Sequence, residues 1–172
     1  MDFITQEQAR QEIVALGLPQ IILDAFDDKP LPYNLDFMFR RPYQIFSMGP
    51  EEQATYGQGR ITPIWTGGTD YTIVAYHHSL AQKGYFRLDI ESPGEEQRPF
   101  GLSWQQVLVM EFKSLWEQEW TDERLREVAG WLGFSYVDML IVQLTQTKLD
   151  TFEKDAVWYQ SFLESVGDER SR

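Results

Sequence analysis

Two adjacent histidines are the residues of this chain best suited to acid–base chemistry or to binding a metal ion. His77 and His78 follow the stretch 71–76, whose β-branched and aromatic residues favour a strand. Adjacent strand residues point to opposite faces of a sheet, so the two rings are poorly placed to bind one metal ion. The sequence contains 0 Cys, which excludes thiolate ligands and a cysteine nucleophile. We therefore expect a pair near a turn, with one exposed ring, and neither a metal nor a cofactor site.

Paired carboxylates are a second source of chemistry, because glycosidases use two of them. The pairs are Glu51–Glu52, Glu95–Glu96 and Asp122–Glu123. A glycosidase holds its carboxylates roughly 5–10 Å apart in a cleft and raises the pKa of one by desolvation. Neighbouring acids in glycine- and proline-containing loops, or at helix starts, are usually solvated. A small hydrolase using loop carboxylates is therefore the alternative function and not the preferred one.

Motifs for a serine nucleophile or a phosphate-binding loop do not occur in the sequence. It contains no Gly-x-Ser-x-Gly, and neither histidine has an identifiable acid to orient it. The segment Gly57-Gln58-Gly59-Arg60 precedes a predicted strand, whereas a phosphate loop connects a strand to a helix. We expect no catalytic residue, and we expect that the chain is not an enzyme.

The net charge carries the clearest functional information. The chain has 27 acidic and 15 basic residues, a net charge of −12 and a pI near 4.5. This charge repels nucleic acids and anionic membranes and attracts a basic partner from a distance. Residues 88–130 hold ten acids and four bases, so a quarter of the chain carries half of the excess. The plainer interpretation is that the charge serves solubility.

The apolar content is sufficient for a folded core. Hydrophobic residues make up 42% and aromatic residues 15% of the 172 positions. This length predicts one domain, or one domain with a small helical extension. The sequence has no apolar run of about 18 residues and no basic start followed by an apolar stretch. We expect a cytoplasmic protein without a membrane partner, whose oligomeric state the sequence does not indicate.

Helix-capping signals define the N-terminal elements. Thr5 and Gln8 have the spacing of a capping box, and Gly17 is suited to end the helix that follows. Pro19 favours the start of a second, short helix that ends near Phe26. From residue 30 to 59 the signal is poor, and only 35–39 and 43–46 are predicted as short strands.

Three further segments predict an antiparallel meander. Strands are expected at 60–65, 71–76 and 85–90, with short turns at 66–70 and 80–84. Pro63 cannot donate to a ladder, so it favours an edge or strand-start position. The fold class is therefore α+β, with an antiparallel β-meander flanked by helices.

The remainder of the chain is predicted to be helical. Ser103 and Gln106 form a second capping box, Thr121 caps a further helix, and Gly133 ends it. Two more helices are expected after Ser135 and Asp150. We expect an α+β domain at 1–118, an all-helical C-terminal extension at 119–166 packed on it, and a frayed tail at 167–172.

The segment 125–136 has the sequence pattern of a DNA-binding helix-turn-helix. Its second helix, 136–148, carries Asp138 and a single base, Lys148. Phosphate contacts from basic residues supply most of the affinity for DNA, so this segment favours a helical hairpin packed on the core. We expect no nucleic-acid partner.

The order of these elements resembles the SUKH superfamily, which includes the Smi/Knr-type cell-wall regulators of fungi and many bacterial immunity proteins. The matching pieces are the amphipathic N-terminal helix running into Leu16-Gly17-Leu18-Pro19, the strand 61–65, the glycine turn 67–71, the strand 72–76, the segment 84–89 and the helix 102–108. The resemblance covers residues 1 to about 118. Segment 30–59 and the helices after Thr121 depart from the family pattern.

The resemblance implies a non-catalytic protein-binding domain, such as an immunity protein that neutralises a toxin by direct binding. Many such toxins are basic nucleases, and an acidic inhibitor gains association rate by electrostatic steering. A regulatory scaffold with a host-protein partner is a further possibility. We expect acids after the sheet, with aromatic anchors, to form the partner surface. The expected partner-binding residues are Trp65, Tyr71, Tyr85, Asp89, Glu91, Glu95 and Glu96; the competing interpretation places the aromatics in the core.

Overall fold

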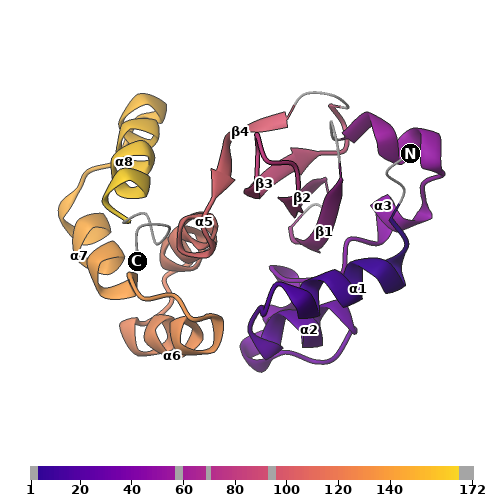
Figure 1. Cartoon of the computed structure of the whole chain (residues 1–172). Coiled ribbons are helices and arrows are strands. Elements are labelled where there is room, and N and C mark those ends of the chain that lie inside the picture. Colours follow the sequence, from indigo (N-terminus) through magenta and orange to yellow (C-terminus); the bar gives the residue numbers. More distant parts are fainter. Residues whose placement is uncertain (1–3, 57–59, 69–70, 93–95, 167–172) are drawn as a thin grey trace. The chain divides into compact units, whose positions relative to one another are not determined.

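The computed structural model describes residues 4–56, 60–68, 71–92 and 96–166 (Figure 1). The chain divides into two compact units, Met1–Leu102 and Ser103–Arg172. A four-stranded antiparallel sheet with helices forms the first unit, and helices form the second. The α+β class, with a meander and C-terminal helices, is confirmed. The division falls earlier than the expected residue 118, because the helix Trp104–Glu117 packs against the helices that follow it.

The first unit begins with α1 (Gln6–Ala15) and α2 (Gln20–Phe26), which lie side by side beneath the sheet in Figure 1. The predicted capping box is confirmed, since the Gln8 N–H donates to Thr5 Oγ1 at 3.2 Å and the Thr5 N–H donates to Gln8 Oε1 at 2.9 Å. Gly17 adopts a φ of +68° just after the helix, as a helix-ending glycine does. The buried faces of both helices fix their position, and both contact the first strand.

The sheet is a meander in the order β1 (Ile61–Thr66), β2 (Thr72–His77), β3 (Gly84–Asp89) and β4 (Glu96–Leu102). The three predicted strands and the edge position of Pro63 are confirmed. The strand β4 was not predicted, because Pro99 and Gly101 interrupt its sequence. A Cβ atom at Gly84 would lie 2.7 Å from Gly101 Cα, so this close pairing of β3 and β4 requires glycine.

One face of the sheet carries the main apolar core of the first unit. Phe86 and Leu88 of β3 pack there with Ile73 of β2 and with Ile45 and Tyr56, which come from the segment before the sheet. The opposite face is defined by the register, which aligns Thr62, Tyr76 and Tyr85 across the first three strands. The period-2 alternation of these strands therefore separates an apolar face from one with polar atoms.

The segment 30–59 differs from its prediction. Residues 35–39 and 43–46 were expected to be strands, but they belong largely to a 3₁₀ helix η1 (Pro32–Phe37) and to α3 (Tyr43–Ser47). Two further short helices follow, α4 (Pro50–Gln53) and η2 (Ala54–Tyr56). Leu35, Phe39 and Ile45 are buried, so their apolar character reflects packing and not a β ladder. Among the described residues of this segment, only Arg40 joins the sheet, through an isolated bridge to Thr66.

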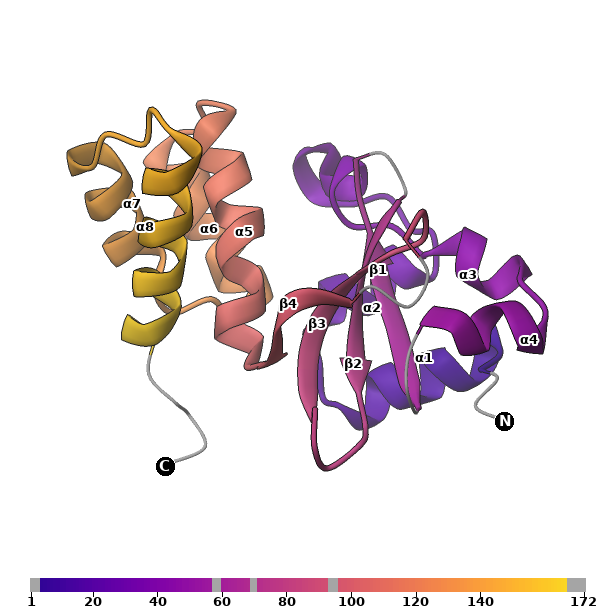
Figure 2. The ribbon, with the colours of Figure 1, turned by 90° about the horizontal axis from the view of Figure 1, so that it is seen from above.

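The second unit contains α5 (Trp104–Glu117), α6 (Asp122–Leu132), α7 (Val137–Gln146) and α8 (Phe152–Ser165), which Figure 2 shows packed together. Its predicted caps are confirmed: Ser103 Oγ accepts from the Gln106 N–H at 3.1 Å, and Thr121 Oγ1 accepts from the Arg124 N–H at 3.3 Å. Gly133 ends α6 with a φ of +67°. The rings of Phe112 and Phe134 stack 4.5 Å apart in the core of this unit.

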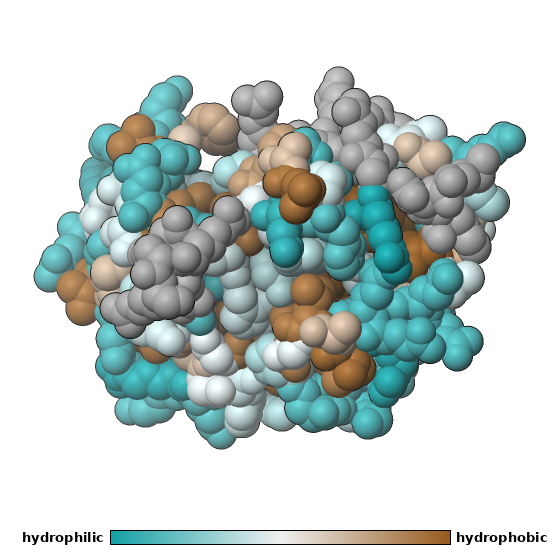
Figure 3. All heavy atoms as spheres, in the orientation of Figure 1, coloured by the Kyte–Doolittle hydropathy of each residue, from teal (hydrophilic) through white to brown (hydrophobic). Residues whose placement is uncertain are grey.

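Within the described residues, no helix combines the length and the apolar character needed to cross a membrane. The face drawn in Figure 3 is largely hydrophilic, with hydrophobic residues exposed in separate places.

Candidate functional site

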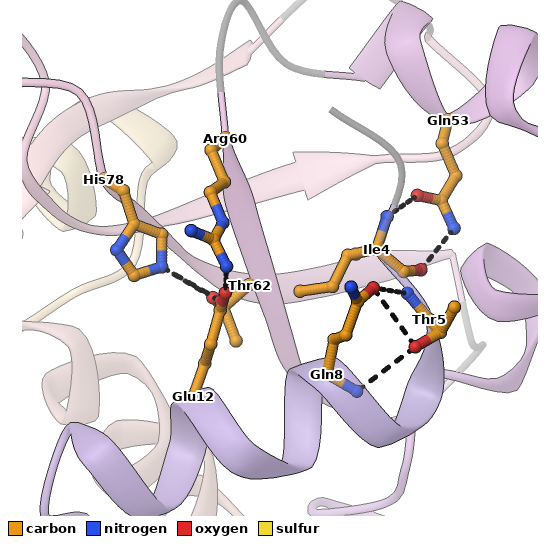
Figure 4. Close-up of polar contacts among 8 residues, drawn as sticks. All are labelled: Ile4, Thr5, Gln8, Glu12, Gln53, Arg60, Thr62 and His78. Carbon is orange, nitrogen blue, oxygen red and sulfur yellow. Dashed lines mark hydrogen bonds and ion pairs between the residues drawn. The ribbon is translucent and has the colours of Figure 1, made fainter. Parts of the chain in front are cut away.

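Four polar side chains converge where α1 meets the ends of β1 and β2 (Figure 4). Glu12 Oε2 accepts a hydrogen bond from the Thr62 hydroxyl and lies 3.2 Å from His78 Nε2. Glu12 Oε1 accepts from the Arg60 guanidinium. His78 Nε2 is also 2.7 Å from Thr62 Oγ1. The acid, imidazole and hydroxyl types of a hydrolytic triad are therefore close together.

The proton positions in this cluster argue against activation of the hydroxyl. A carboxylate only accepts hydrogen bonds, so the single hydroxyl proton of Thr62 is directed to Glu12. His78 Nε2 must then be the donor toward Thr62 Oγ1, and a nitrogen that carries a proton cannot remove one. In a triad, the acid binds the ring nitrogen on the far side from the nucleophile, whereas Glu12 and Thr62 contact the same nitrogen. Thr62 is also fully buried. The cluster therefore joins α1 to the sheet.

Burial lowers the pKa of His78, and the electrostatic effects of Arg60, His77 and Lys83 act in the same direction. The adjacent Glu12 carboxylate acts in the opposite direction, because it favours the charged imidazolium. We conclude that desolvation is the larger effect, since Glu12 already accepts hydrogen bonds from Thr62 and Arg60.

The two histidines occupy different environments, as their alternation in the strand predicts. His77 is fully buried, and its Nδ1 accepts from the Ser79 N–H at 3.2 Å. His78 is half-buried, with 30% of its side chain exposed. The expectation that neither histidine has an acidic partner is corrected for His78, which contacts Glu12. Among the described residues, no group of three or more His, Asp or Glu side chains is placed to hold a metal ion.

Two of the seven expected partner-binding residues are buried. Trp65 is 2% exposed and lies against Phe39, with ring centroids 5.4 Å apart. Tyr85 is 7% exposed and contacts Tyr76 edge-on at 5.0 Å, and burial raises the pKa of its hydroxyl. The expectation that both anchor a partner is corrected, because neither presents its ring to solvent. The competing interpretation of core aromatics applies to them.

Three other expected residues meet at one end of the sheet. Cross-strand pairing places Asp89 opposite Thr72, and the Ile90 N–H donates to the Tyr71 carbonyl at 2.9 Å. Tyr71 is 43% exposed, Glu91 is exposed and Asp89 is half-buried. Asp89 Oδ1 accepts from the Glu91 N–H at 2.9 Å, which fixes the chain as it leaves β3. We call Tyr71, Asp89 and Glu91 the acidic sheet end.

The last two expected residues adjoin this place in the sequence. Glu95 lies outside the described residues. The backbone of Glu96 begins β4 and pairs with Leu88 of β3, next to Asp89. The strand pairing therefore brings Glu96 to the same end of the sheet as Asp89.

The remaining sequence candidates have structural roles where they are described. Glu52 accepts from the Gly49 N–H at 3.1 Å and caps α4, while Asp122 and Glu123 lie in the first turn of α6. Of the glycine-rich segment 57–60, only Arg60 is described. The helix-turn-helix pattern corresponds to α6 and α7, and Gly133 ends the first of these helices. An ion pair joins the two helices, with Arg126 Nε 2.8 Å from Asp138 Oδ1.

The excess of acids is divided equally between the two units. Residues 1–102 contain 14 acids and 8 bases, and residues 103–172 contain 13 and 7. The charge excess at 88–130 therefore extends from the sheet end into the helices, and the acidic sheet end is one part of a generally negative molecule.

No family model, no curated protein and no solved structure matches this chain.

Proposed function

We propose that this chain is a non-catalytic protein that binds a basic protein partner and thereby neutralises or regulates it, as a toxin-immunity protein does. The observation that carries the proposal is the acidic sheet end, where the backbone of Tyr71, a residue that is 43% exposed, pairs with the segment that carries Asp89 and Glu91. The resemblance to the SUKH superfamily supports the same class of function.

The chemistry of this surface suits protein recognition. Tyrosine is enriched among residues that dominate binding energy, because it buries a large ring with few rotatable bonds and keeps one polar group. Cross-strand pairing and the Ile90–Tyr71 backbone hydrogen bond hold the main chain here, which reduces the conformational entropy lost when a partner binds. An exposed tyrosine and two carboxylates at one end of a sheet favour a partner that carries lysine or arginine near an apolar patch.

The charge of the whole molecule supports a basic partner. A net charge of −12 raises the rate of encounter with a cationic protein, and such steering is worth 10- to 1,000-fold in rate at low salt. A basic nuclease is a fitting partner, because carboxylates on an inhibitor replace the phosphates that such an enzyme binds.

The test compares two charge variants of the full chain as baits in lysate from the source cells. In Asp89→Asn/Glu91→Lys, Asn keeps the Oδ1 acceptor for the Glu91 N–H while the surface loses its negative charge. The matched control is Glu51→Lys/Glu164→Gln, which changes the net charge equally at exposed carboxylates of α4 and α8. We expect a basic protein to be retained by the wild type and the control and lost by the first variant.

The captured protein is then assayed with and without the chain. Inhibition of its activity by the wild type, reduced in Asp89→Asn/Glu91→Lys, supports neutralisation. Equal retention by all three baits would exclude the acidic sheet end as the binding surface. Turnover of a small substrate by the purified chain would favour the alternative, a hydrolase.

A further inference from the structure

We propose that the helical unit contains a binding site for a small organic carboxylate with an apolar body, in the cavity between α7 and α8. This cavity is a groove open to solvent with a volume of about 520 Å³, and the described residues that line it come from these two helices and the loop that joins them. Pockets of about 300–1,000 Å³ are typical of small-molecule sites. This site is separate from the acidic sheet end and does not depend on the proposed protein-binding role.

The cavity offers apolar contacts for the body of the ligand. Most of its lining surface is apolar, with Val157 and Trp158 of α8 among the contributing residues. Trp158 is 6% exposed and packs on Phe162 at a centroid distance of 5.2 Å, so the indole is firmly held. Val157 is 69% exposed. A ligand that covered Val157 would remove this apolar surface from water.

Trp158 also provides an unused hydrogen-bond donor. Its Nε1 is buried and has no acceptor within the described part of the chain. Buried polar groups are almost always paired, so an unpaired indole N–H next to a cavity favours a ligand with an acceptor atom.

Two lysines favour a negatively charged acceptor. Lys148 and Lys154 both line the cavity, and both pair with the same carboxylate, Asp150, at 3.1 Å and 2.7 Å. With Glu153 and Asp150 the charges of this region sum to zero, so the attraction for a ligand carboxylate is local and comes from the N–H groups of the two ammonium ions. Glu153 is the carboxylate within the lining and opposes this attraction. Removing the charge of Lys154 should weaken the binding of a carboxylate, and removing the charge of Glu153 should strengthen it.

The experiment titrates decanoate into the full chain labelled with ¹⁵N and follows the indole N–H signals. Trp158→Phe identifies the signal of Trp158, which we expect to shift saturably as its N–H gains an acceptor. This variant should raise the Kd of decanoate about 2- to 12-fold, which is the effect of one hydrogen bond. Lys154→Gln should raise the Kd about 1.5- to 5-fold, and Glu153→Gln should lower it.

Decanol is the matched probe without charge. We expect its Kd to be the same in the wild type, Lys154→Gln and Glu153→Gln, because an alcohol lacks the charge that these residues sense. If Trp158→Phe does not fold, as judged by circular dichroism, the Lys154 and Glu153 variants still decide the question. The proposal is overturned if decanoate produces no saturable shift of the Trp158 signal, or if its Kd is equal in Lys154→Gln and Glu153→Gln.

Discussion

The Oε2 atom of Glu12 in α1 lies 3.2 Å from the Nε2 atom of His78, which directly follows β2. The buried hydroxyl of Thr62 bridges the two groups, and Arg60 binds the other carboxylate oxygen. The first helix is thus joined to the ends of two neighbouring strands by a single carboxylate. Because Glu12 is only 14% exposed, these contacts are shielded from water and are stronger than those of a surface ion pair.

Glu12→Ala is expected to destabilise the chain by about 1–3 kcal/mol, because the buried Thr62 hydroxyl loses its acceptor and Arg60 its partner. Urea unfolding followed by far-UV circular dichroism measures the change. Glu7→Ala is the control, since Glu7 is an exposed acid of the same helix without a described partner. A Glu12→Ala midpoint equal to that of Glu7→Ala would show that the cluster adds nothing to stability.

The stability of the chain should fall as the pH drops below about 6.5. Burial lowers the pKa of His78 in the folded chain, so between that value and the ordinary one the unfolded chain binds more protons than the folded chain. Protonation therefore favours the unfolded state in this window, and stability recovers as the pH rises. His78→Asn removes this contribution, so the wild-type stability should drop more than that of the variant between pH 7 and 5.5. The opposite difference would show that Glu12 controls the titration.

Local signals in the sequence predict the helix ends well. The boxes at Thr5–Gln8 and Ser103–Gln106 need only residues three positions apart, and both form as expected. Gly133 likewise ends α6 in the left-handed conformation that its type predicts. The strands at 61–66, 72–77 and 84–89 follow because alternation and tight turns are also short-range features.

Features that depend on residues far apart in the sequence cannot be predicted from local sequence patterns. The strand β4 contains Pro99 and Gly101, and only its pairing with β3 reveals it. Glu12 has no short-range sequence relation to His78, so the cluster appears only when the register of β1 and β2 is known. The expected role of Trp65 and Tyr85 fails for the same reason, since an aromatic residue in a strand has the same local pattern whether it is buried or exposed.

Gln53 gives a further test, because its buried amide forms hydrogen bonds with the backbone of the N-terminal segment. Its Oε1 accepts from the Ile4 N–H at 3.0 Å, and its Nε2 donates to the carbonyls of Ile4 and Ile45 at 3.1 and 3.0 Å. Gln53→Leu removes all three hydrogen bonds and is expected to cost about 2–4 kcal/mol in urea unfolding. Gln44→Leu, at an exposed glutamine of α3, is the matched control and should change stability by less than about 0.5 kcal/mol. Similar losses in both variants would mean that the amide of Gln53 has no special role.

Charge and the aromatic ring should affect different steps in the binding of a basic partner at the acidic sheet end. The carboxylates should set the association rate, and the Tyr71 ring should set the dissociation rate. Charged groups at the rim of an interface act mainly on association, whereas a buried anchor acts on dissociation. Reversing Glu95 and Glu96 to lysine should therefore slow association several-fold at low salt and flatten its salt dependence, with little change in the dissociation rate. Tyr71→Ala should instead raise the dissociation rate about tenfold or more, as loss of an aromatic anchor does.

Surface plasmon resonance at several salt concentrations separates these two effects once the partner is purified. The control is Glu51→Lys/Glu164→Lys, which changes the net charge as much as the Glu95 and Glu96 reversal does, but on α4 and α8. General steering by the total charge slows association equally in both double variants, because the long-range field depends on the sum of the charges. A specific surface slows the first variant more than the second, since the attraction grows as the charges approach within a Debye length of about 10 Å. An unchanged association rate in the Glu95 and Glu96 variant would remove this end of the sheet from the partner surface and leave the charge of −12 as a property of solubility.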